Sequence, residues 1–208
     1  MELTAVALKL ADSLLATRAR LKVGYKNNIG NRLKVNKYYD LVTGFYEYGW
    51  GDSFHFVGRD PGETIREGIK RHQHFMALQL GLKKDMKLST DNWIEQRLPD
   101  LKGQGDFMNM PIADNTFDVA YAIDATCHAP DAQGVYSEVY RVLKPGQCFA
   151  LAEWRLTDRF DPNNAKHLTI KAEIELGDGL PDIRTTRQCV QAMKDAGFEV
   201  SYSCVINR

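Results

Sequence analysis

Aromatic residues are concentrated in one stretch of the sequence, Tyr38 to Phe56. It reads YYDLVTGFYEYGWGDSFHF, with eight aromatic residues in nineteen positions, although such residues make up 10% of the whole chain. Its three glycines are so close together that they predict a folded loop whose rings line a cavity. Facing rings bind large apolar ligands and stabilise a positive charge by cation–π attraction, worth about 2 kcal/mol once water is excluded. The alternative is an aromatic cluster packed under a loop.

Acidic residues and a histidine follow two apolar runs. Asp118 to Asp124 (DVAYAID) and Cys148 to Trp154 (CFALAEW) are typical of strands buried on both faces. Ligands bind at the carboxyl ends of parallel strands, where the sequence places Asp124, His128 and Glu153. Such side chains can accept or donate protons during a reaction. The alternative is that they cap helices or are solvated in loops.

A further acidic cluster lies between Glu173 and Gly179, which reads EIELGDG. It contains Glu175 and Asp178 beside two glycines, and both carboxylates are candidates for the same site. His72 and His74 do not predict a metal site, because side chains two positions apart on a helix point to opposite sides. We therefore expect no metal.

The remaining patterns predict an α/β protein with a parallel sheet. Helices are expected over 63–80, ending at Gly81, over 132–143, stopped by a Lys-Pro-Gly sequence, and over 185–196, capped by Gly197. Residues 198–205 alternate like a strand, whereas nothing in 82–105 alternates in this way. The order strand, helix, strand, helix, strand is the pattern of a parallel sheet.

The composition indicates a globular chain of 208 residues with 44% hydrophobic and 26% charged residues. No apolar run reaches the roughly 20 residues that span a bilayer, and no secretory signal is expected. The four cysteines have no paired spacing, which indicates a reducing compartment. Residues 1–37 are basic and apolar at helical spacing, so we expect a helical N-terminal segment that rests on an anionic membrane surface or packs on its own domain.

Several motifs resemble one known family. YEYGWG followed by SFHF resembles the aromatic signature of the sterol 24-C-methyltransferases. GDFMNMP, NTFDVAYAIDATCHAP, YSEVYRVLKPG, FALAEW and IKAEIELGDGLPDIR follow in the order of that family's blocks. The resemblance runs from about Asn36 to Val200, excepting Leu88 to Gly103. LKPGQCFA and DGLPDIR are most similar to the plant-type enzymes that act on cycloartenol.

The resemblance implies a class I methyltransferase with a Rossmann-like sheet, which uses S-adenosylmethionine (SAM) as methyl donor and no metal. The methyl group would be transferred to C24 of a sterol such as cycloartenol, and the resulting carbocation would undergo a hydride shift and lose a proton. The family's motifs assign His128, Asp124 and Glu153 to catalysis. They assign substrate binding to Tyr46, Glu47, Tyr48, Trp50, Trp154, Glu175 and Asp178, and cofactor binding to Asp106, Phe107 and Ala125.

The sequence departs from the family in three places. Asp124 stands where the family more often has Glu. After Lys87 the family has a strand, a glycine-rich loop close to LDVGCGxGG, a helix and a second strand, whereas this chain continues with LSTDNW. On the order of 30 residues, at least one βαβ unit, are missing. The chain also stops at Arg208, where the family continues. We therefore expect an incomplete sheet in which Asp118 to Asp124 has lost a neighbour.

The expected organisation is an N-terminal segment, 1–37, followed by a truncated methyltransferase domain, 38–208, that begins with the aromatic stretch. The expected function is sterol 24-C-methylation in sterol biosynthesis. The alternatives are an inactive sterol-binding or regulatory partner of a full-length enzyme, or a non-functional truncated isoform. We further expect a homo-oligomer without nucleic-acid partners, bound peripherally to the cytoplasmic face of the endoplasmic reticulum membrane.

Overall fold

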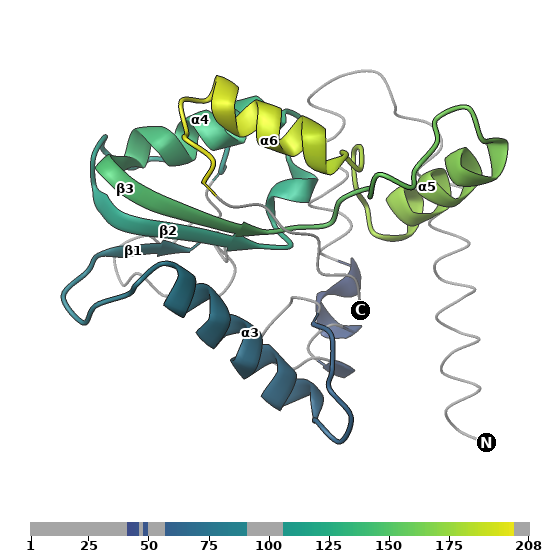
Figure 1. The fold of residues 1–208 in the computed structure, drawn as a ribbon, viewed down its shortest axis with the longest axis horizontal. Coiled ribbons are helices and arrows are strands. Elements are labelled where there is room, and N and C mark those ends of the chain that lie inside the picture. Colours follow the sequence, from purple (N-terminus) through teal and green to yellow (C-terminus); the bar gives the residue numbers. More distant parts are fainter. Residues whose placement is uncertain (1–40, 46–47, 50–56, 91–105, 202–208) are drawn as a thin grey trace.

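The computed structural model describes residues 41–45, 48–49, 57–90 and 106–201. Its centre is a parallel sheet of three strands in the order β1-β2-β3. The strands are β1 (Leu88–Thr90), β2 (Phe117–Ile123) and β3 (Leu143–Ala152). Helices α4 (Ala132–Val142) and α6 (Thr186–Asp195) cover one face, and α3 (Ile65–Gln79) lies on the opposite side (Figure 1). The parallel α/β architecture is therefore confirmed.

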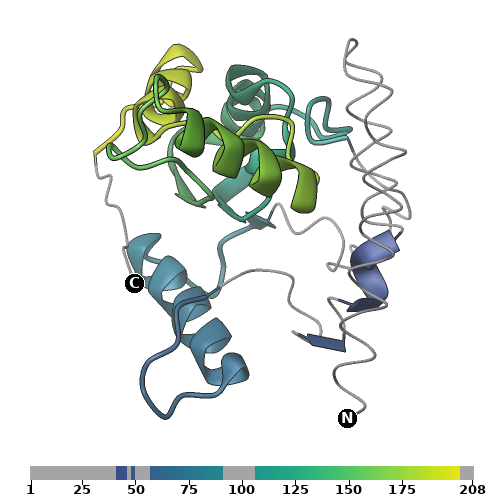
Figure 2. The same cartoon turned by 90° about the vertical axis from the view of Figure 1, so that its right-hand side faces the viewer.

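Helix α5 (Ala165–Gly177) stands beyond the carboxyl ends of β2 and β3 (Figure 2). The sequence analysis assigned no helix here, yet Glu173 and Glu175 of the acidic cluster both lie in α5. Its apolar residues are spread around the helix and none is buried, so the sequence shows no one-sided helical period. The Asn164 side chain caps its start by accepting a hydrogen bond from the Lys166 N–H at 3.0 Å.

Strand β2 forms the centre of the sheet, with a neighbour on each side. Five of the seven residues 117–123 are buried, as the apolar run predicts, and the strand pairs in parallel with β3. The expectation that 82–105 contains no strand is wrong, because Leu88–Thr90 pairs with β2 in the register Leu88 to Val119. Within the described residues, β2 therefore keeps a second partner. A strand is defined by its backbone hydrogen bonds, so three residues can form one without an alternating side-chain pattern.

Asp118 ties β2 to both neighbouring strands. Its carboxylate accepts hydrogen bonds from the Lys87 N–H at 2.8 Å and from Lys144 Nζ at 2.6 Å. Its own N–H donates to the Lys87 carbonyl at 2.9 Å. Lys144 and Lys87 also lower the pKa of the Asp118 carboxyl group.

The predicted helices are confirmed with small changes at their ends. Thr64 and Glu67 form a capping box at the start of α3, and Gly81 follows its end with φ of 58°. Thr185 caps α6 in the same way. The strand expected over 198–205 is wrong for its described part, because residues 198–201 form no strand. Phe198 instead packs against the rings of Tyr140 and Phe149, with centroids 5.1 and 5.7 Å away.

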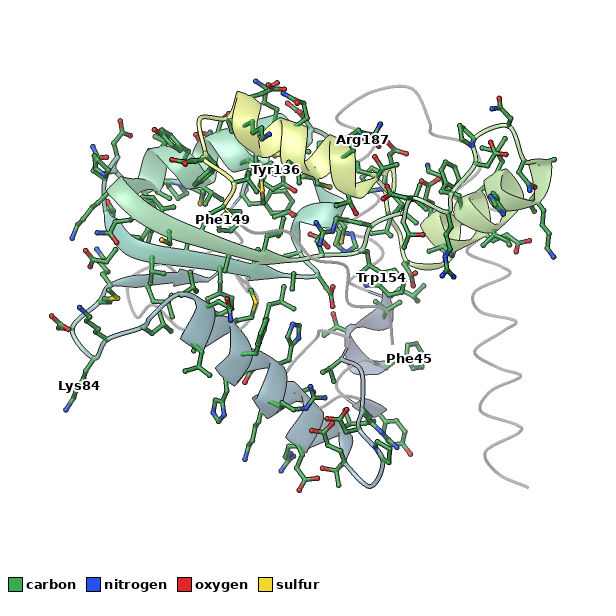
Figure 3. The ribbon with its side chains drawn as sticks, in the orientation of Figure 1. Phe45, Lys84, Tyr136, Phe149, Trp154 and Arg187 are labelled. Atoms are coloured by element: carbon green, nitrogen blue, oxygen red, sulfur yellow. The ribbon has the colours of Figure 1, made fainter. Side chains whose placement is uncertain are left out.

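The core lies between the sheet and helices α4 and α6. Tyr136 from α4 faces Phe149 from β3 in this layer, with ring centroids 6.3 Å apart (Figure 3). At Gly134 the side chains of Met108 and Asp131 lie close to α4, since a Cβ there would be 2.6 Å from Met108 Cε and 2.8 Å from Asp131 Oδ2. None of the helices in the described part of the chain has the length and apolar character to cross a membrane.

Candidate functional site

The site begins where β2 ends. Asp124 has a left-handed backbone with φ of 51°, which turns the chain sharply, and its N–H donates to the Ala152 carbonyl at 2.9 Å. A single 3-10 turn, η1 (Thr126–His128), follows directly, and all three of its residues are buried. This turn is therefore packed inside the protein at the carboxyl edge of the sheet, where ligands bind in parallel α/β folds.

Glu153 follows β3 and reaches across to this turn. Its Oε2 accepts hydrogen bonds from Thr126 Oγ1 at 2.6 Å and from the Cys127 N–H at 2.7 Å. Its Oε1 accepts from the Trp154 N–H at 3.0 Å. Burial raises the pKa of the Glu153 carboxyl group, and these hydrogen bonds oppose that rise.

The turn also contacts the segment that follows α5. The Cys127 side chain packs with Leu180 and Ile183 in one buried cluster, and a hydrogen bond links His128 with the backbone of Gly179. His128 is only 8% exposed. Burial lowers the pKa of its imidazole to about 4, so His128 is neutral at physiological pH.

Asp178 precedes Gly179 at the end of α5 and is half-buried. Burial raises the pKa of its carboxyl group. In the part of the chain that the structure describes, its carboxylate takes part in no ion pair and accepts no hydrogen bond. Asp178 therefore has a partly desolvated carboxylate. It is connected to the buried turn through the next residue, Gly179, whose backbone is hydrogen-bonded to His128.

Glu175, which the sequence groups with Asp178, has a different environment. It forms an ion pair with Lys171, and its Oε1 accepts a hydrogen bond from the Ile183 N–H at 2.8 Å. Lys171 also pairs with Asp182 at 2.5 Å. The Glu175 side chain thus fastens α5 to the 178–183 segment, and it shares the cation of Lys171 with Asp182.

The predicted cofactor residues lie on two sides of this edge. Ala125 connects Asp124 to the turn. Asp106 accepts a hydrogen bond from the Met108 N–H at 3.0 Å, and Phe107 packs on the cluster of Ala129 and Ala132 that directly follows the turn. The loop of Asp106 and Phe107 is therefore brought to the start of α4, beside the turn in the fold although about twenty residues away in the sequence.

The aromatic stretch is described only in part, since Tyr46, Glu47 and Trp50 lie outside the described residues. Residues 41–45 and 48–49 are helical, so the expectation of a loop is wrong for them. A glycine costs a helix only about 1 kcal/mol, so Gly44 and Gly49 do not prevent helix formation here. The Tyr48 side chain is 90% exposed, so it lines no cavity formed by the residues that the structure describes.

Trp154, the other predicted aromatic ligand, is 36% exposed and lies beyond the end of β3, away from the Tyr136 layer (Figure 3). Sequence reasoning missed Thr126 and Cys127, which connect Glu153 to the turn. It also missed Arg184, whose Nη2 donates to the Ala129 carbonyl at 2.7 Å. The signal for Thr126 and Cys127 was their position directly after a predicted strand. Within the described residues, no group of three metal-ligating side chains gathers.

Comparison with known proteins shows what the chain is similar to. Residues 83–151 match the family described as a methyltransferase domain. The chain is 54% identical to cycloartenol-C-24-methyltransferase 1 from Oryza sativa and 52% identical to cycloartenol-C-24-methyltransferase from Arabidopsis thaliana, in each case over 202 positions that cover 80% of this chain. It spans 59% and 60% of the length of these relatives.

The alignments also show how many residues this chain lacks within the aligned region. Since 80% of 208 residues is about 166, about 36 of the 202 aligned positions have no residue in this chain. This agrees in size with the segment that the sequence indicates to be missing. Among solved structures, one described as a sarcosine dimethylglycine methyltransferase from Galdieria sulphuraria shares the fold, with a TM-score of 0.61 at 21% identity over 74% of this chain and 72% of that protein. By sequence, this chain is therefore similar to the sterol 24-C-methyltransferases, and it spans about three-fifths of the plant members it matches.

Proposed function

We propose that the chain acts as a sterol 24-C-methyltransferase, which transfers a methyl group from SAM to C24 of a sterol side chain. The observation that carries the proposal is its identity of more than half with two plant proteins named for that reaction on cycloartenol. The fold supports it, because the residues that the family's motifs assign to chemistry meet at the carboxyl edge of the sheet. Cycloartenol is the substrate that the names of these relatives favour.

SAM, when bound, supplies the electrophilic methyl group. Asp106, Phe107 and Ala125 would hold it, and the fold supports this role by bringing the 106–107 loop to the start of α4 beside the turn. Asp106 already accepts a hydrogen bond from the Met108 N–H, which fixes the direction of its carboxylate. Such an orientation suits an acceptor for ligand hydroxyl or amino groups.

The last step of the implied reaction removes a proton from a carbocation. The environments of the candidate bases favour Asp178. His128 is a poor proton acceptor, because burial disfavours its imidazolium form. The carboxylate oxygens of Glu153 already accept hydrogen bonds from protein donors. Asp178, with a raised pKa and no charged partner among the described residues, can take up a proton at the least cost.

The test is a methyl-transfer assay on the purified chain, with radiolabelled SAM and cycloartenol and extraction of the sterol product. A full-length relative serves as the positive control. We expect labelled 24-methylated sterol from the chain. No labelled sterol from a chain that shows a cooperative thermal transition would contradict the proposal.

A second candidate function is supported by the same alignments. About 36 aligned positions of the relatives are missing here, and the sequence indicates that they include the glycine-rich loop, through which such folds approach their cofactor. The chain would then bind sterol without methylating it, as a partner of a full-length enzyme. Calorimetric titrations separate the two functions: sterol binding without SAM binding would favour the partner, and binding of both would favour the enzyme.

We also propose peripheral association with the cytoplasmic face of the endoplasmic reticulum membrane, together with homo-oligomerisation. The apolar nature of a sterol supports the first, since such a substrate partitions into bilayers. Flotation with vesicles and analytical ultracentrifugation of the purified chain test these two proposals. A chain that stays out of the vesicle fraction, or sediments as a monomer, would contradict the respective proposal.

A further inference from the structure

We propose that Glu153 is a positioning residue that fixes the Thr126–His128 turn, and through this turn the 178–183 segment, at the carboxyl edge of the sheet. This role differs from that of a catalytic acid or base, which the residue type and position alone suggest. Its catalytic consequence rests on the proposed function, whereas its structural consequence can be measured without any activity.

The first step of the argument is the way in which the carboxylate is used. Both oxygens accept hydrogen bonds from the protein: Oε2 from Thr126 Oγ1 and the Cys127 N–H, and Oε1 from the Trp154 N–H. The distances of 2.6 and 2.7 Å to Oε2 are those of charge-assisted bonds. These three bonds use most of the roughly four acceptor positions of the carboxylate, and protonation would weaken them because hydrogen bonds to a charged acceptor are the stronger ones.

The second step is what the turn would be without Glu153. Its own backbone bonds are two of the short 3-10 type, from the His128 N–H to the Ala125 carbonyl at 3.2 Å and from the Ala129 N–H to the Thr126 carbonyl at 3.0 Å. Bonds of this type have poor geometry and form short, weak turns. Glu153 directly follows β3, which is paired with β2, so its carboxylate holds the turn from a rigid neighbouring strand.

The third step leads from the turn to the 178–183 segment. Cys127, whose N–H binds Glu153, packs its side chain against Leu180 and Ile183. His128, the next residue, is linked to the Gly179 backbone. A shift of the turn would therefore move the segment that carries Asp178. Glu153 acts through these contacts, and nothing in the geometry requires it to touch a substrate.

Substitutions can separate the bonds from the fold. Glu153→Gln keeps the shape of the side chain, but one of its two oxygens becomes an NH₂ group, which cannot accept a hydrogen bond. This group must face either the Trp154 N–H or the two donors of the turn, so at least one bond is lost. Thr126→Val removes the hydroxyl donor at nearly constant volume, and Thr126→Ser is the matched control that keeps it. Hydrogen bonds to charged groups of this kind change local equilibria by roughly tenfold to a hundredfold.

The experiment measures alkylation of Cys127 by iodoacetamide, peptide by peptide, in the folded wild-type chain and in the three variants. Because Glu153 also raises the pKa of the Cys127 thiol, the rates are compared per thiolate, from their pH dependence in each chain. Cys148 in β3, which is exposed, is the internal control. We expect Cys127 to react roughly tenfold or more faster in Glu153→Gln and Thr126→Val, and at the wild-type rate in Thr126→Ser, with Cys148 and the urea midpoint unchanged. Unchanged Cys127 rates would overturn the proposal, and so would a fall in the urea midpoint large enough to explain the faster rate by global unfolding, which would mean that Glu153 supports the whole fold.

Methyl transfer by the same variants supplies the catalytic readout. We expect kcat to fall in Glu153→Gln and Thr126→Val and to stay at the wild-type value in Thr126→Ser, because the turn adjoins the proton acceptor. A loosened turn with unchanged kcat would overturn its catalytic role. If the wild-type chain transfers no methyl group, the proposed function fails, and the Cys127 rates alone decide whether Glu153 positions the turn.

Discussion

His128 should make the stability of this protein depend on pH in the acidic range. Burial lowers the pKa of its imidazole to about 4 in the folded chain, whereas a solvated histidine has a pKa near 6.5. Between these values the unfolded chain binds the proton and the folded chain does not. The free energy of unfolding therefore falls as pH is lowered from about 6.5 to about 4, and it changes no further from this group below pH 4.

The size of the effect follows from the two pKa values. Each unit between them corresponds to about 1.4 kcal/mol, so lowering the pH from 7.5 to 4.5 should cost about 2.5 kcal/mol through His128 alone. Other groups titrate in the same range with either sign. Burial raises the pKa values of Glu153 and Asp178, whereas Arg141 holds that of Glu138 low. The effect of His128 must therefore be read as a difference between two chains.

The measurement is urea-induced unfolding at pH 7.5 and 4.5, followed by circular dichroism, for the wild-type chain and His128→Gln. Glutamine keeps a polar side chain but does not titrate. We expect the wild-type chain to lose about 2.5 kcal/mol more than the variant over this range, whatever the variant loses at pH 7.5. Equal losses for the two chains would refute the reasoning and would mean that His128 is solvated or paired with a carboxylate.

Arg141→Met should lower the free energy of unfolding by about 1–3 kcal/mol, because Arg141 binds two loop carbonyls and two carboxylates. The matched control Arg187→Met, at an exposed position, should change it little, and similar urea midpoints for the two variants would contradict this prediction. Gly177→Ala, which has open space for its Cβ, should stabilise the chain by up to about 1 kcal/mol through helix propensity. Gly134→Ala should stabilise it less, because its Cβ displaces the ends of the Met108 and Asp131 side chains, and a larger gain in thermal stability at 134 than at 177 would exclude the predicted crowding. Asp178→Asn should lower kcat for sterol methylation by roughly 10²–10⁴-fold with unchanged sterol affinity, and a wild-type kcat would remove Asp178 as the base.

The tertiary structure decided features that depend on distant partners. Leu88–Thr90 is a strand because it pairs with the edge of β2, and no local sequence pattern predicts it. Residues 198–201 alternate, yet they form no strand, since Phe198 is held by rings from α4 and β3. Helix α5 carries its apolar residues on all sides, so it leaves no periodic signal, although its cap and its ion pair make it a helix.

The sequence by itself determined the two longer strands, the three capped helices and the resemblance to one family. The expectation that both strands are buried is right for β2 and wrong for β3, in which only Leu143 is buried. Buried strands require continuous apolar runs, and caps require particular residue types, so both can be predicted from neighbouring residues in the sequence. It also placed Asp124, His128 and Glu153 at one edge, because the ends of parallel strands meet there. Their roles were decided by the fold alone: burial keeps His128 neutral, two donors on the turn occupy Glu153, and desolvation without a described partner sets Asp178 apart from Glu175. Burial and hydrogen-bond partners come from residues far apart in the sequence, and no local pattern records them.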